Sequence, residues 1–174
     1  MKKSFFSLLM FSATLIGCQN NTAESSKPNG ALPASPAAVV ADTLCFEFKY
    51  KQDVTSCQLI IEGDKVKGYF DWSPFEKDGG HGVLENGVKK GEMITVDWKM
   101  MIEGSIQTEE LLLKLEGDKL SKMEGELVEK GDKVVIKSPE TAKAQDVLMK
   151  VDCSKIASAI DNAKAAETAM KNMK

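Results

Sequence analysis

The sequence predicts a mainly β protein: a single up-and-down antiparallel β-barrel of about eight strands, followed by a C-terminal α-helix. From Leu44 onwards, apolar and polar residues alternate over short runs, which is the period of a strand with one buried face. Glycine-containing turns separate these runs at short intervals, as in a series of hairpins. No long helical pattern lies between the runs, which excludes parallel βαβ units.

A charged start and a short apolar segment open the chain. Lys2 and Lys3 precede an almost wholly apolar run over residues 5–16, and the small residue Gly17 follows it. The run is shorter than the stretch of about 20 apolar residues that spans a bilayer. This order of features is typical of a secretory signal peptide, here cleaved before Cys18.

The sequence at this cleavage site, Leu15-Ile16-Gly17-Cys18, resembles the lipobox of bacterial lipoproteins. The resemblance implies that Cys18 becomes the first residue of the mature chain and carries a diacylglyceryl group and an N-acyl chain such as palmitate. Two or three acyl chains anchor a protein stably where one does not. Gln19, in the place of an aspartate, implies sorting to the outer membrane, with the periplasmic or surface face left open. The alternative is a plain secretory signal with Cys18 as an ordinary thiol.

These features divide the chain into four parts. Residues 1–17 are the signal peptide, 18–43 the lipidated cysteine and a flexible tether, 44–153 the barrel and 154–174 the C-terminal helix. The tether is rich in Asn, Ser, Ala and Pro, so it cannot bury enough apolar surface to order itself. We expect it to keep the barrel close to a membrane without embedding it.

Apolar faces mark the expected strands. The first strand has Phe46, Phe48 and Tyr50 on one side, and the clearest face extends from Ile94 to Ile102. The expected strands lie at residues 44–51, 55–61, 66–72, 81–88, 94–102, a run that ends at 115, 123–127 and 134–136. A meander of this kind can close on itself and so remove its exposed edges.

The tripeptide Gly-Asp-Lys recurs between these runs, at residues 63–65, 117–119 and 131–133. Glycine supplies a positive φ and aspartate bonds its own backbone, so the three sites predict hairpin turns. A function as acidic metal loops is disfavoured, because the spacing is irregular and each site has a single nearby carboxylate pair. Within the fourth expected strand, Asn86-Gly87 indicates a turn or a bulge.

The meander resembles lipocalin-like, up-and-down β-barrel lipoproteins. More specifically, the C-F-E-F start at Cys45, the E-G-D-K turns and the K-V-D-C close at Cys153 are similar to those of small lipoproteins of Bacteroidota-type bacteria. The similarity covers residues 44–153 and implies a fold rather than a function. The G-x-W opening of lipocalins does not occur in this sequence.

After Pro139 the strand pattern weakens. Residues 140–146 tolerate a helix, and the apolar residues 147–151 predict a last strand or an extended strap. Ser154 then offers an N-cap for the C-terminal helix. One helical stripe follows, formed by Ile156, Ile160, Ala163, Met170 and Met173.

Three cysteines remain after Cys18, and export places them where disulfides form. Cys45 lies on the face opposite Phe46 and points outward, whereas Cys57 shares the inward face of the second strand. Two cysteines on opposite faces of neighbouring strands cannot approach to bonding distance. We therefore expect a Cys45–Cys153 disulfide and a buried Cys57 thiol, with Cys57–Cys153 as the alternative.

Composition and motifs argue against nucleic-acid binding and catalysis. The formal net charge is −3 and all 23 basic residues are lysines, so the arginine fork that favours phosphate and guanine recognition is missing. The one histidine, His81, has no nucleophile motif near it, and no cysteine spacing matches a zinc module. No phosphate loop or dinucleotide fingerprint occurs. We predict a protein that is not an enzyme and that uses no cofactor or metal.

Two features remain as candidate sites. The loop over residues 72–81 is the longest connection of the meander, and it offers Trp72, Phe75 and His81 to a ligand or a partner. The alternative is that its two aromatic residues plug the barrel end. Glu109 shares the parity of the inward leucines, so it is either an interior carboxylate, as functional sites contain, or a rim residue in water.

The sequence thus predicts a cell-envelope protein that is anchored to a membrane, in the first place the outer membrane, through Cys18. We expect a non-catalytic binding or structural module that contacts an envelope protein or component through its barrel-end loops. The alternative is a lipocalin-like carrier of a small apolar ligand in the barrel interior. The interior distinguishes the two, because a packed barrel has no room for a ligand and an apolar pocket above about 300 Å³ does.

Overall fold

The computed structural model describes residues 40–173; the export signal, Cys18 and most of the tether lie outside the described residues. The strands are β1 (Asp42–Tyr50), β2 (Asp53–Glu62), β3 (Lys65–Ser73), β4 (Gly80–Lys90), β5 (Met93–Ile102), β6 (Ser105–Glu116), β7 (Lys119–Glu124), β8 (Leu127–Lys130), β9 (Lys133–Ile136) and β10 (Lys143–Val151). The helices are two short 3₁₀ turns, η1 (Pro139–Thr141) and η2 (Cys153–Ile156), and the α-helix α1 (Ala157–Asn172). Within the described part, no helix has the length and apolar character needed to cross a membrane.

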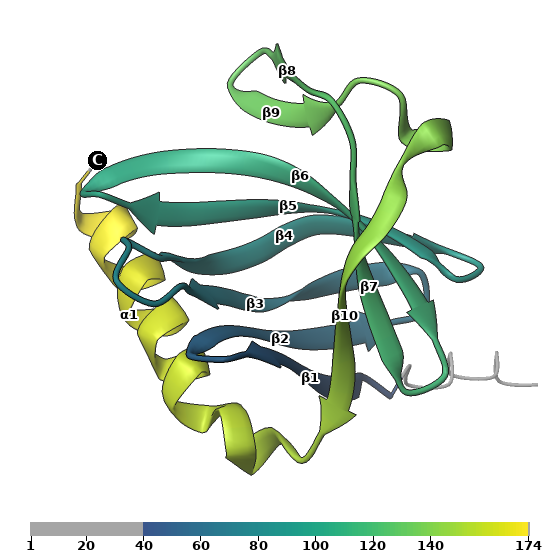
Figure 1. Ribbon diagram of the computed structural model, residues 1–174, viewed down its shortest axis with the longest axis horizontal. Helices are drawn as coiled ribbons and strands as arrows, with labels where there is room; N and C mark the ends of the chain where they lie inside the picture. The colour runs from purple at the N-terminus through teal and green to yellow at the C-terminus, as the bar shows by residue number, and fades with distance from the viewer. Residues whose placement is uncertain (1–39, 174) are drawn as a thin grey trace, which may run out of the picture. The chain divides into compact units, whose positions relative to one another are not determined.

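Eight of the strands form a closed antiparallel barrel (Figure 1). Each strand from β1 to β6 pairs with the next along the chain, and β10 lies between β7 and β1 and completes the ring. The predicted fold, a mainly β barrel of eight strands with a C-terminal helix, is confirmed. Closure through β10 brings the two ends of the barrel segment together, because β10 pairs with the first strand.

The eighth barrel strand differs from the one that the sequence suggested. β8 and β9 form a separate hairpin, and its ladder with β6 consists of a single parallel pair, Glu109 and Val134. Within this hairpin only Val135 and Ile136 are buried, which is too few to build a barrel wall. β10 takes the eighth position, and residues 143–146, which we expected to tolerate a helix, belong to it. Figure 1 shows the hairpin standing away from the barrel.

The barrel interior is packed at the end where the β2–β3, β4–β5 and β6–β7 turns lie. Alternate residues of the strands point inward there and are buried, as period-two patterning requires. The buried inward residues at this end include Leu59, Val66, Ile94, Leu113, Leu120 and Leu148. The other end of the barrel is less completely filled, and it holds the candidate site described below.

The helix α1 packs on the outside of the barrel against β2 to β5, and Figure 1 shows it running beside these strands. Its buried residues are Ile160, Ala163 and Met170. Met173, which we expected on the same stripe, is exposed. Tyr69 of β3 donates a hydrogen bond from Oη to Oε2 of Glu167 on the helix, at 3.3 Å. Burial and the Glu167 carboxylate both raise the pKa of Tyr69.

A disulfide joins Cys45 on β1 to Cys153, with Cα atoms 5.1 Å apart, so the preferred pairing is confirmed. Cys45 points outward from the barrel, yet it is buried because Ile156 and Ile160 pack against it. Cys57 lies in the core as a free thiol. Parity therefore identified the correct pair, and burial raises the pKa of the Cys57 thiol.

The chain enters α1 through the 3₁₀ turn η2. Asp152 caps this turn: its Oδ1 accepts hydrogen bonds from the Ser154 hydroxyl at 2.6 Å and from the Ser154 backbone N–H at 2.9 Å. These two bonds lower the pKa of Asp152. No side chain caps α1 itself, so the predicted N-cap role of Ser154 is wrong.

The predicted irregularity in β4 is a bulge. Asn86 has a φ of 57°, and the registers against β3 and β5 both shift beside it. Gly87 lies so close to β3 that a Cβ there would stand 2.4 Å from the carbonyl oxygen of Val66. Glycine is therefore required at this position, as at many bulges.

Candidate functional site

A cavity of about 370 Å³ opens at the less filled end of the barrel. Residues from six strands, β2, β3, β5, β6, β7 and β10, line it. It therefore lies inside the ring of strands, at the end where β3 finishes and β6 begins. We call it the mouth cavity. Its volume falls at the lower end of the range for pockets that bind small molecules, about 300–1,000 Å³.

The floor of the mouth cavity is apolar and largely aromatic. Its members are Phe70, Trp72, Trp98, Met100 and Ile102. The rings of Phe70 and Trp98 meet edge to face, with centroids 4.9 Å apart and planes at 62°. Such pairs stabilise each other beyond the area that they bury. The floor is therefore a fixed surface rather than a loose collection of side chains.

One polar atom in this floor is unsatisfied. The indole Nε1 of Trp98 has no hydrogen-bond partner among the described residues, although Trp98 is only 3% exposed. A Cβ on Gly80, at the start of β4, would lie 2.8 Å from Cη2 and 3.1 Å from Cζ2 of the indole. The Cη2–Cζ2 edge of the ring thus lies against the start of β4. A buried N–H without an acceptor is uncommon and calls for a partner.

Charged and amide side chains form the rest of the cavity wall, which we call the rim. Glu109 of β6 lies in the cavity wall, directly across the β5–β6 ladder from Trp98, and its Oε1 is 3.5 Å from Nζ of Lys122 on β7. Its carboxylate thus lies in the interior wall and pairs with a cation, with a side chain 20% exposed. The other polar members of the rim are Gln107, Glu124, Gln145 and Asp146.

The structure separates the three residues of the candidate loop. Trp72 faces the mouth cavity and is 38% exposed. Phe75 lies in the loop itself, half exposed, with its backbone N–H donating to Oδ1 of Asp53 at 2.7 Å. His81 takes the opposite parity from Trp72 and points to the outside of the barrel, on the side of Tyr69. The loop therefore does not form one common site with all three.

Asp71 is a residue that sequence reasoning missed. It is 1% exposed, and its Oδ2 lies 2.6 Å from Nδ1 of His81 on the neighbouring strand. Its Oδ1 accepts a hydrogen bond from Oγ of Ser73 at 2.7 Å. Ser73 thus bonds the carboxylate and not the imidazole, so the three residues lack the order of a nucleophilic triad. They form a polar cluster that holds the ends of β3 and β4 together.

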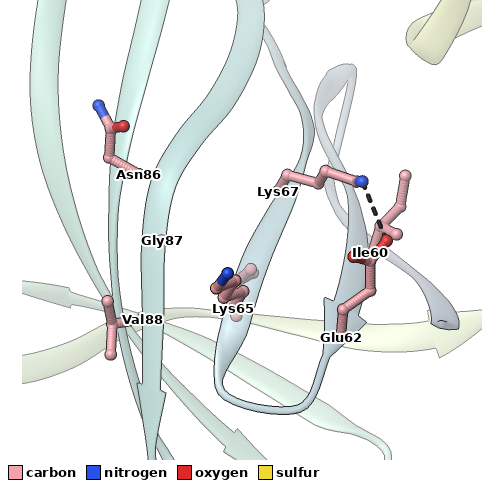
Figure 2. Close-up of a pocket in the computed structure, with 8 residues that line it drawn as sticks. Ile60, Glu62, Lys65, Lys67, Asn86, Gly87 and Val88 are labelled. Carbon is pink, nitrogen blue, oxygen red and sulfur yellow. Dashed lines mark hydrogen bonds and ion pairs between the residues drawn. The ribbon is translucent and has the colours of Figure 1, made fainter. Parts of the chain in front are cut away.

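A second hollow, of about 500 Å³, lies at the β3–β4 bulge (Figure 2). Figure 2 shows Lys67 turning from β3 toward Glu62 on β2, with Asn86 and Val88 on the other side of the hollow. Nζ of Lys67 and Oε1 of Glu62 are 3.0 Å apart and both side chains are exposed. Although this hollow is larger, residues of only three neighbouring strands line it, whereas six strands surround the mouth cavity, so the mouth cavity is the stronger candidate.

Metal and thiol chemistry find little support in these residues. Between residues 40 and 173, no three His, Cys, Asp or Glu side chains gather closely enough to hold a metal ion. The Cys57 thiol is fully buried, which disfavours its reactive thiolate form.

The chain matches no protein family, no curated protein and no solved structure. The closed antiparallel barrel of eight strands is consistent with a lipocalin-like fold. Fold and site together define a small β-barrel with a packed base and a hollow mouth.

Proposed function

We propose that the protein is a non-catalytic envelope lipoprotein that binds a small molecule in the mouth cavity. The carrying observation is the cavity itself, with its aromatic floor and its charged rim. This combines the two functions that the sequence left open: the binding site lies at the barrel end, and the ligand enters the interior. The rim requires a ligand that is polar at one end, so a purely apolar ligand fits less well.

The membrane anchor is part of the same proposal. The lipobox at Leu15–Cys18 supports acylation of Cys18 and a place in the cell envelope, in the outer membrane according to Gln19. Growth of the native host with labelled palmitate tests this. Label is expected on the protein and is expected to be lost in Cys18→Ala.

Native mass spectrometry of the full lipidated chain, purified from its own host, tests the ligand. We expect a bound small-molecule mass that dissociates on activation. Gln107→Phe, which fills the rim of the cavity, is expected to remove this mass. Thr108→Phe is the matched control, because it is the next residue of β6 and points to the outside. A chain without any bound small molecule, or equal retention by both variants, contradicts the proposal.

A protein partner at the loop after β3 is the second candidate function. The half-exposed ring of Phe75 favours it, since an exposed aromatic residue on a loop is a typical contact residue. If this candidate function is correct, the mass that co-purifies is that of a protein. Phe75→Ala is then expected to remove this mass, and Gln107→Phe is expected to keep it.

A further inference from the structure

We propose that the β8–β9 hairpin is a movable cover over a side opening in the barrel wall, through which the ligand of the mouth cavity enters and leaves. This inference rests on the proposed function, because it describes how that site exchanges its ligand. Three observations support it. The wall lacks a backbone ladder beside the cavity, a hollow lies in the wall at that place, and side chains fix the hairpin to the barrel.

The barrel wall is incomplete between β6 and β7. Their ladder ends at the pair Leu112–Met123, although β6 continues over residues 105–111 toward the open end of the barrel. Over that stretch, the only ladder partner of β6 on the side away from β5, among the described residues, is Val134 of the hairpin. Beyond Leu112 this part of the wall is therefore closed chiefly by side chains.

A hollow of about 150 Å³ lies at this gap, beside the mouth cavity. Met123 of β7 lines it, together with Leu127 and Ile136 of the hairpin. Leu111 also lines it, although this side chain belongs to the barrel core and is 1% exposed. Because a hollow beneath the hairpin reaches a core side chain, it penetrates the wall between β6 and β7.

Three charged side chains line both this hollow and the mouth cavity, and they are Glu109, Lys122 and Glu124. They therefore stand between the two spaces. Glu109 belongs to β6 and Lys122 to β7, so their ion pair spans the gap, with Oε1 and Nζ 3.5 Å apart. A close charge-assisted hydrogen bond measures about 2.7–2.9 Å, so this pair is loose. It can separate without the loss of a ladder bond.

The β8–β9 hairpin holds together by itself. Its two strands pair over residues 127–136, and the backbone N–H of Lys137 donates to the carbonyl oxygen of Glu126 at 2.8 Å. This bond closes the base of the hairpin, close to where the chain leaves β7. A unit with its own hydrogen bonds moves as one body about the short segments that join it to the rest of the chain.

Side chains fix this unit to the barrel. Nζ of Lys133 lies 2.7 Å from Oδ1 of Asp97 and 2.8 Å from Oε2 of Glu110. Ile136 is 8% exposed and lies against Gly125, where an added Cβ would be 2.9 Å from its Cγ2. Opening requires that the two ion pairs separate and that Ile136 leaves the hollow. The closed form is therefore favoured, and the cover opens transiently.

Reaction of introduced cysteines with N-ethylmaleimide tests the cover. Leu111→Cys places a thiol in the hollow, where the reagent reaches it only when the hairpin lifts. Leu113→Cys is the matched control, because Leu113 is equally buried on the same face of β6 but lies behind the complete ladder, opposite Lys122. Both are made in the full chain with Cys57→Ala. Peptide mass spectrometry, without reductant, measures the rate of labelling at each new cysteine.

We expect Leu111→Cys to react about tenfold faster than Leu113→Cys, because local opening exposes the first thiol and only wider unfolding exposes the second. Lys133→Ala is expected to raise the rate at Leu111→Cys by about a further fivefold. Lys137→Ala is expected to leave it unchanged, because its ion pair with Glu126 lies at the base of the hairpin. Leu113→Cys should respond to neither lysine variant.

Met100→Cys tests whether the opening leads into the mouth cavity. Met100 lies in the cavity floor and is 6% exposed. If the reagent enters from the side, labelling of Met100→Cys is expected to be at least about twofold faster with Lys133→Ala than with Lys137→Ala.

Equal labelling of Leu111→Cys and Leu113→Cys overturns the cover, as does a rate at Leu111→Cys that Lys133→Ala does not change. A rate at Met100→Cys that is the same with both lysine variants overturns the passage into the cavity. These measurements need no ligand. The proposed function fails separately, because it is decided by whether the protein from its own host carries any small molecule.

Discussion

Asp71 and His81 are paired across the β3–β4 ladder, with Oδ2 of the first 2.6 Å from Nδ1 of the second. The carboxylate is buried, whereas the imidazole side chain is 32% exposed. The histidine therefore lies between a buried charge and the solvent. The pair links β3 to β4, and we expect the loss of either residue to weaken this link.

Removal of the histidine tests this contact. His81→Ala leaves the Asp71 carboxylate with only Ser73 to bond it, and we expect the free energy of unfolding to fall by about 2 kcal/mol, as for the loss of a hydrogen bond to a charged group. Urea denaturation measures the change. Asp71→Asn in the same chain removes the buried charge and is expected to restore part of the loss. A change below about 1 kcal/mol for His81→Ala would be inconsistent with a buried charge.

The Cys45–Cys153 disulfide is expected to provide much of the stability of the barrel. The two cysteines are 108 residues apart, and closing a loop of that size stabilises by about 4–5 kcal/mol in the entropic description. Cys45→Ser with Cys153→Ser is therefore expected to lower the free energy of unfolding by about that amount. Reduction of the unaltered protein should give the same curve. A chain that is equally stable with and without the bond would refute this role.

The buried Cys57 thiol predicts a specific dependence of stability on pH. Burial raises its pKa in the folded state above the ordinary value of 9.0, so above that pH the unfolded chain loses a proton that the folded chain keeps. The stabilisation is thus complete below pH 9 and is lost as the pH rises, by about 1.4 kcal/mol per unit. Cys57→Ala should remove this slope, while its other pH dependence stays the same. Parallel curves for both proteins from pH 8 to 10.5 would contradict the prediction.

Close backbone contact makes Gly68 one of the least replaceable residues. A Cβ at this position would lie 1.8 Å from the carbonyl oxygen of Gln58 on β2. Gly68→Ala is therefore expected to separate β2 from β3 and to cost about 3 kcal/mol or more, measured by thermal unfolding. Gly117→Ala is the control, because it has a φ of 59° but open space around it, and should cost about 1 kcal/mol. Equal costs would show that the contact with Gln58 is unimportant.

Lys133 connects the β8–β9 hairpin to the barrel. Its Nζ lies 2.7 Å from Oδ1 of Asp97 and 2.8 Å from Oε2 of Glu110, and these bonds raise the pKa of Lys133. Lys133→Ala is expected to increase hydrogen exchange across residues 127–136 about fivefold, without a change in the barrel strands. Lys137→Ala is the control, because its ion pair with Glu126 stays within the hairpin region. Unchanged exchange in Lys133→Ala would show that the hairpin is held by other contacts.

The alternation of apolar and polar residues predicted correctly those barrel strands that have one buried and one exposed face. Ile94, Val96 and Trp98 are all buried, and the opposite parities of Cys45 and Cys57 selected the correct disulfide. Period-two patterning is reliable there, because a shift of one residue would move every apolar side chain into water.

The last barrel strand and the polar pair were harder to predict. β10 buries only Leu148 fully, so its alternation is weak, whereas β9 has the stronger apolar run but lies outside the barrel. Pairing of Asp71 with His81 depends on the register across a long loop, which the sequence leaves open. The parity of Asp71 was misleading by itself, because it places the residue on the outward face, between the inward Phe70 and Trp72, whereas the side chain is buried.

The hairpin has a consequence for how copies of this protein meet. β7 pairs with β6 only over residues 112–116, so before Leu112 that side of β6 has a single strand contact, with Val134. Unpaired strand edges invite pairing with a neighbouring chain. β8 and β9 occupy this gap, and we expect a chain without them to be prone to strand exchange and aggregation.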